Sequence, residues 1–179
     1  MMILKPQDIL VLLKLVAISR NNWSYHSLAI DLGMSAAEVH AAIKRAVFAN
    51  LAIPQGDKSI PYIRNLQEFI VHGLRFVFIP EHGGIIRGIP TSHAAPPLSS
   101  VFLSDGDPPP VWPDSQGLVR GMSFSPLYAS APKAALADPI LYELLVLVDA
   151  IRGGRARERS FATKELTQRL EAYAQNTKP

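Results

Sequence analysis

Ten of the fifteen prolines in this chain fall between residues 80 and 132, and this clustering restricts the possible folds more than any other feature. Proline fixes φ and lacks a backbone N–H, so it interrupts long helices and central strands. We therefore expect segment 80–132 to contain turns and short strands. Long helices are expected only before and after it.

The chain before the prolines begins with a helical pattern. Apolar residues recur at helical spacing over residues 5–20, and Pro6 lies in the first turn, where proline is tolerated. Ser24 is placed to cap a second helix over residues 25–32. Gly33 is placed to end this helix in a tight turn.

A third helix is predicted over residues 35–49. Ser35 and Glu38 have the spacing of a capping box, in which each side chain bonds to the backbone of the other residue. Gly33 supplies the left-handed turn before this helix, and Ala29 is small enough for the two helices to cross closely. The buried face of the pair is formed by Leu28, Leu32, Val39 and Ile43. Together these features predict a helix-turn-helix.

A hairpin is predicted next, from two short apolar segments, 51–53 and 60–63, around the polar turn sequence PQGDKS. Pro54 and Pro61 confine its strands to the edge of a sheet.

Several weaker patterns come after the hairpin. Asn65 and Glu68 have capping-box spacing and predict a helix to about residue 75, and the apolar run 76–80 is interpreted as a strand. The similar sequences IIRGIP (85–90) and LVRGMS (118–123) are interpreted as paired strands.

The C-terminal part is predicted to be helical. Asp138 is placed to cap a helix that begins at Pro139 and ends at a pair of glycines. Residues 140–151 are apolar on almost every side, so this helix must be covered all round, in a core or between subunits. We expect the helix 139–152 to form a homodimer interface, with the core of a monomeric domain as the alternative. A polar amphipathic helix completes the chain.

The predicted fold class is mainly α with small β elements, in two parts. Residues 1–76 form an N-terminal winged helix-turn-helix domain. Residues 77–179 form a proline-rich segment followed by the C-terminal helical region that dimerises.

Residues 7–64 resemble the winged helix-turn-helix of bacterial transcription regulators, in the broad manner of MarR-like proteins. The resemblance is carried by LAIDLGMS (28–35), EVHAAIKRA (38–46) and the hairpin around PQGDKS. It covers about a third of the chain. It implies that the helix 35–49 enters the major groove of double-stranded DNA, and that the hairpin tip near Lys58 contacts the backbone or the minor groove.

The resemblance also implies individual DNA contacts. The residues facing the bases would be Ser35, Ala36, Ala37, His40, Ala41 and Lys44. The residues holding phosphates would be Lys44, Arg45, Lys58 and Arg64. Three of the six base-facing positions are alanine, and none is the Arg, Asn or Gln that usually reads a base with two hydrogen bonds. We therefore expect much of the specificity to come from groove shape and from dimer spacing.

An alternative interpretation gives the same motif another role. In it, the winged helix is a protein-interaction module, for instance an antitoxin-like partner of a neighbouring gene product, and the cations are solvated surface residues. Residues 1–76 carry eight Lys/Arg against five Asp/Glu, residues 77–138 three against five, and residues 139–179 seven against five. Basic ends give weak support to an anionic partner.

No catalytic or metal-binding pattern is evident in the sequence. The five histidines lack the spacing of a helical metal pair. Ser92 precedes His93, but neighbours in a chain rarely point at each other, so we interpret them as part of a structured loop. We expect no enzymatic activity, no cofactor and no metal. Because cysteine is absent and the apolar run 9–18 is short, we expect a cytoplasmic location and no membrane partner.

Overall fold

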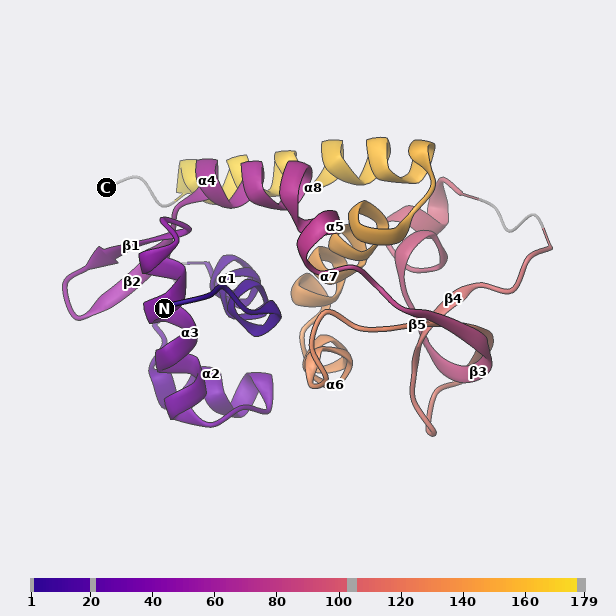
Figure 1. Ribbon diagram of the computed structural model, residues 1–179, viewed down its shortest axis with the longest axis horizontal. Helices are drawn as coiled ribbons and strands as arrows, with labels where there is room; N and C mark the ends of the chain where they lie inside the picture. The colour runs from indigo at the N-terminus through magenta and orange to yellow at the C-terminus, as the bar shows by residue number, and fades with distance from the viewer. Residues whose placement is uncertain (1, 20–21, 103–105, 177–179) are drawn as a thin grey trace.

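A computed structural model describes residues 2–19, 22–102 and 106–176 (Figure 1). Its helices are α1 (Pro6–Ile18), α2 (Tyr25–Leu32), α3 (Ala36–Phe48), α4 (Ile63–Glu68), α5 (Leu74–Val77), α6 (Ala131–Ala137), α7 (Pro139–Gly153) and α8 (Ala156–Asn176), with a π-helical turn η1 (Phe69–Gly73) and 3₁₀ turns η2 (Ser92–Ala94) and η3 (Leu98–Ser100). Its strands are β1 (Ala52–Gln55), β2 (Lys58–Pro61), β3 (His82–Pro90), β4 (Pro110–Pro113) and β5 (Val119–Phe124). The expected class, mainly α with small sheets, is confirmed.

Helix α2 begins and ends at the predicted local signals, and α3 begins at its predicted signal. The Ser24 hydroxyl accepts a hydrogen bond from the backbone of Ser27 at the start of α2. Gly33 ends α2 with φ of 62°, the left-handed conformation that glycine adopts without steric cost. Ser35 and Glu38 form the predicted capping box at the start of α3. The local rules of helix capping therefore account for this part of the fold.

The predicted hairpin is also present. Strands β1 and β2 pair antiparallel, with Ala52 opposite Pro61 and Gln55 opposite Lys58. Gly56 lies at the tip with φ of 62°. The two strands form a sheet of their own.

Residues 65–80 are helical as far as Val77, but the predicted capping box and the predicted strand are both wrong. Helix α4 begins at Ile63, before the supposed capping box, and the side-chain amide of Asn65 instead donates to the carbonyl of Asn50. The chain stays helical through η1 and α5, where a strand had been expected from residue 76. Leu74 is fully buried and α5 packs on α7, so tertiary packing extends the helix through an apolar run that local patterning cannot assign.

Strands β3, β4 and β5 close into a small barrel. Segments 85–90 and 118–123 pair as predicted, and the structure shows that they run antiparallel, with Ile85 opposite Met122 and Arg87 opposite Arg120. The short strand β4 was not predicted, and it runs parallel to β5. The chain passes close to itself here: a Cβ at Gly121 would lie 1.9 Å from the carbonyl oxygen of Pro109.

Helix α7 is the centre of the molecule, which overturns the expectation that it forms a subunit interface. Leu141 and every residue from Leu144 to Arg152 are buried within the single chain. The helix packs against α1, α5, α6, α8 and η2. Its apolar surface is therefore covered by the protein's own helices, which was the alternative interpretation of this segment.

The two predicted parts of the chain share one core. The predicted boundary after residue 76 falls near the end of α5, and one cluster of buried side chains extends from α1 through α7 to α8. The ammonium group of Lys14 lies 2.8 Å from a carboxylate oxygen of Asp138 and 3.2 Å from one of Asp31, which links α1 to α2 and to the start of α7. Figure 1 shows α1–α3 and the hairpin at one end, the barrel at the other and α8 extending from the barrel end to α4.

Candidate functional site

The exposed face of α3 is a narrow stripe opposite its buried face. Val39, Ala42, Ile43 and Ala46 are buried against the core. The stripe consists of residues at helical spacing on the other side: the exposed Ala37, His40, Lys44 and Phe48, and the half-buried Ala41. Two of these five side chains are polar, and Lys44 has no partner among the residues that the structure describes. This surface offers few hydrogen-bonding groups to any partner.

The first turn of α3 is occupied by its own cap. The Ser35 hydroxyl accepts from the backbone N–H of Glu38, and the Ser35 N–H donates to the Glu38 carboxylate at 2.7 Å. That backbone hydrogen bond lowers the pKa of Glu38, so its carboxylate stays charged at the exposed N-terminal end of the helix. Ala36 and Ala37 are exposed beside it. Ser35 therefore has a structural task in addition to the predicted contact with a base.

Arg45 points into the protein. Its guanidinium forms a two-point interaction with the carboxylate of Asp8 in α1, with Nη2 2.6 Å from Oδ1 and Nε 2.8 Å from Oδ2. The hydrogen bond to Asp8 raises the pKa of Arg45. Because successive helical residues are about 100° apart, Lys44 lies on the exposed stripe while Arg45 faces α1. The sequence prediction grouped these two neighbours, and the structure separates them.

A row of rings connects the exposed stripe of α3 to the hairpin. The His40 ring lies 5.1 Å from the ring of Tyr25, which packs edge-on against Trp23 at 5.4 Å. The Lys58 ammonium lies 5.3 Å from the centre of the Trp23 ring and 2.9 Å from the side-chain oxygen of Asn22. We call Trp23, Tyr25 and His40 the aromatic row. The aromatic row, together with Lys58 of β2, places the start of α2, the middle of α3 and the hairpin on one surface.

Trp23 and Tyr25 were not among the contacts predicted from the sequence. The sequence nevertheless contains a pattern that could have identified these two residues. Trp23 and Tyr25 flank the N-cap Ser24, and the start of the first helix in a helix-turn-helix lies beside the exposed face of the second. Arg64, the last predicted phosphate contact, is exposed in the first turn of α4, directly after the hairpin.

Three comparisons, with models of protein families, with curated protein sequences and with solved structures, find no match for this chain. Within the described residues, no helix combines the length and the apolar character needed to span a bilayer.

Proposed function

We propose that this protein is a DNA-binding transcription regulator in which α1–α3 and the β1–β2 hairpin act as a winged helix-turn-helix. One observation carries the proposal: the aromatic row aligns the start of α2, the exposed stripe of α3 and Lys58 of the hairpin on a single surface. These are the elements that a winged helix presents to DNA, with α3 in the major groove.

The proposed contacts differ in kind along this surface. Lys44 and Arg64 are exposed and hold phosphates as point charges. Lys58 is partly held by Trp23 and Asn22, so its ammonium is positioned before DNA arrives. His40 supplies a hydrogen bond to a base edge, and Ala36, Ala37 and Ala41 contact thymine methyl groups. Arg45 is left out of the contact set because Asp8 occupies its guanidinium.

A homodimer on DNA remains part of the proposal, with an interface other than α7. Two half-sites would add their phosphate contacts and impose a spacing, which compensates for a recognition helix with few polar groups. Light scattering of the free protein, and of the protein with excess duplex, measures whether one or two chains are present. We expect two chains per bound duplex.

The proposal is tested by fluorescence anisotropy with a labelled duplex of arbitrary sequence at low salt. Lys44→Gln and Arg64→Gln should each weaken binding on every sequence and reduce the slope of log K against log salt by about one. The matched control is Lys164→Gln, which removes an exposed cation from α8. If Lys44→Gln and Arg64→Gln bind as the wild type does, with an unchanged slope, α3 and the hairpin do not dock on DNA.

One observation favours the second candidate, a protein-interaction module. Phe48 is 65% exposed at the end of α3, and Ile53 is exposed on the adjoining strand β1. Apolar side chains at this junction suit a protein partner better than a phosphate backbone. Complete absence of duplex binding at low salt, with the wild-type protein folded, would favour this candidate.

A further inference from the structure

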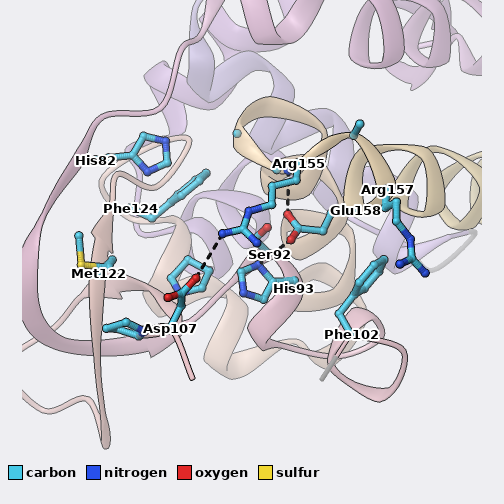
Figure 2. A pocket seen from close by; sticks show the side chains of 15 residues that line it. His82, Ser92, His93, Phe102, Asp107, Met122, Phe124, Arg155, Arg157 and Glu158 are labelled. Atoms are coloured by element: carbon cyan, nitrogen blue, oxygen red, sulfur yellow. Dashed lines mark hydrogen bonds and ion pairs between the residues drawn. The ribbon is translucent and has the colours of Figure 1, made fainter. Parts of the chain in front are cut away.

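A cavity of about 730 Å³ lies in the C-terminal half, between the barrel, η2 and the first turn of α8 (Figure 2). This volume is within the range of small-molecule sites in proteins. The side chains that Figure 2 shows around it include His82, His93, Met122, Phe124 and Arg155. The cavity shares no lining residue with the surface proposed to bind DNA. Ligand binding here can therefore be tested separately from DNA binding.

Ser92 is the most unusual residue in the cavity wall. Its φ is 52°, a left-handed conformation that serine rarely adopts, and its relative exposure is 2%. Its hydroxyl has no hydrogen-bond partner in the part of the chain that the structure describes. The open cavity beside it is where a partner atom can be supplied.

The conformation of Ser92 is imposed by its neighbours. The Thr91 hydroxyl donates to the buried carboxylate of Asp149 at 2.7 Å, and the Trp112 indole N–H donates to the same oxygen at 2.7 Å. One residue before Thr91, the Tyr142 hydroxyl donates to the Pro90 carbonyl at 2.6 Å. Strained residues persist where the surroundings fix them, and such residues cluster at functional sites. The backbone that leads into Ser92 is therefore fixed by these hydrogen bonds.

The polar end of the cavity is formed by His93 and the start of α8. The Glu158 carboxylate accepts from the backbone N–H of Arg155 at 2.8 Å and lies 3.4 Å from Nδ1 of His93. The Arg155 side chain forms an ion pair with Asp107 at 3.3 Å, and both of these side chains are about three-quarters exposed. An exposed pair of this kind is weak, so Arg155 is available to a ligand. The N-terminal end of this long helix adds a favourable field for negative charge.

The part of the cavity wall that strands β3, β4 and β5 contribute is mainly apolar. Phe124 is almost fully buried in β5, and the His82 ring packs edge-on against it at 5.1 Å. Met122 precedes it on the same face of β5, and Pro110 of β4 lies next to Met122 in the barrel. Met122 is 39% exposed, and its flexible thioether side chain is an adaptable surface for a ring.

We propose that this cavity binds a small organic molecule that carries one negative charge and an aromatic ring. The anionic group accepts hydrogen bonds from the Ser92 hydroxyl and the Arg155 guanidinium at the start of α8, and the ring lies on the exposed Met122 side chain. A single charge fits better than a polyphosphate because the acids Glu158 and Asp107 lie beside the cations. When the ligand binds, Glu158 keeps its contact with His93 and its hydrogen bond from the Arg155 N–H. The Arg155 side chain leaves Asp107 and pairs with the ligand instead.

The test uses two fluorescent probes, anilinonaphthalene sulfonate and its uncharged analogue N-phenylnaphthylamine. The wild-type protein should bind the sulfonate at one saturable site, and bind the uncharged probe at least tenfold more weakly. Arg155→Gln should weaken sulfonate binding by about tenfold, the loss expected for one hydrogen bond to a charged group. Lys164→Gln, an exposed cation further along α8, is the control and should bind as the wild type does.

Ser92→Gly separates a binding role from a structural one. Glycine adopts positive φ freely, so this variant removes the hydroxyl and also relieves the backbone strain. We expect its melting temperature to rise while its affinity for the sulfonate falls several-fold. The proposal is overturned if the wild type has no saturable site, if the two probes bind equally, or if Ser92→Gly and Arg155→Gln both bind the sulfonate like the wild type. Near-ultraviolet circular dichroism of each variant establishes that the probe reports on folded protein.

Discussion

The carboxylate of Asp8 is wholly buried, and the guanidinium of Arg45 is its charged partner, with Nη2 2.6 Å from Oδ1. Asp8 also caps α1, where one of its oxygens accepts from the Lys5 N–H at 2.8 Å. This pair joins the first helix to the third across the core of the N-terminal unit. Removing one partner of a buried ion pair leaves an uncompensated charge inside the protein.

Arg45→Ala should therefore destabilise the protein severely. We expect a loss of about 3–5 kcal/mol in the free energy of unfolding, measured by urea denaturation. Lys44→Ala, at the neighbouring exposed position, should change it by less than about 0.5 kcal/mol. Equal stability of the two variants would contradict the pairing. Any loss of DNA binding in Arg45→Ala should be interpreted through this stability change rather than as a lost phosphate contact.

Gly33 should tolerate a side chain poorly. Its φ of 62° places it in the left-handed region, where a residue with a Cβ costs about 1–2 kcal/mol. Space is not the reason, because an added Cβ would meet Ser130 at an ordinary 3.5 Å. Gly33→Ala should lower the melting temperature, and Gly33→Val should lower it further or abolish soluble expression. Gly84→Ala is the control, since an added Cβ there meets nothing within 4 Å and its φ is ordinary. A Gly33→Val protein as stable as the wild type would contradict this account of the turn.

Charged substitutions in the middle of α7 should unfold the protein. Leu145 and Val148 are 1% and 0% exposed, so a glutamate at either position is placed in the core without a partner. Leu145→Glu and Val148→Glu should lose their helical circular dichroism signal or form aggregates. Ile140→Glu, in the first turn of the same helix and 59% exposed, should stay folded. A folded Leu145→Glu protein with a changed oligomeric state would restore the interpretation of α7 as an interface.

Tyr142 should make the protein sensitive to alkaline pH. Burial raises the pKa of its hydroxyl above the ordinary value of about 10, so the folded state favours the protonated form. Below the ordinary pKa both states hold the proton and this contribution to stability is fully present. As the pH rises above that value, the unfolded state ionises first, and the contribution is lost progressively up to the folded-state pKa.

Tyr142→Phe tests this pH dependence directly. The variant loses the hydrogen bond to the Pro90 carbonyl, so at neutral pH we expect it to be less stable by about 0.5–1.5 kcal/mol. Between pH ~9 and ~11 its urea midpoint should fall less steeply than that of the wild type. Parallel pH profiles for the two proteins would show that the Tyr142 hydroxyl has the same pKa in the folded and unfolded states.

The sequence by itself determined the elements whose signals are local. The N-caps Ser24 and Ser35, the left-handed Gly33 and the proline at the start of α7 each act within one turn of chain, so they could be recognised without knowing the fold. The pairing of β3 with β5 was recognisable for a different reason, the similarity of their two sequences. The all-round apolar pattern of α7 required it to be covered, and this too was correct.

Tertiary structure alone decided what covers α7, which way Arg45 faces and what lies around Ser92. Each answer depends on residues far apart in the chain: α1 and α8 pack on α7, Asp8 pairs with Arg45, and Glu158 lies against His93. Periodicity states that a side chain is buried or exposed, but it carries no information about the partner that buries it. The exposed face of α3 and the cavity at the start of α8 both result from such long-range packing, so the sequence could indicate their residues but could not assemble them into sites.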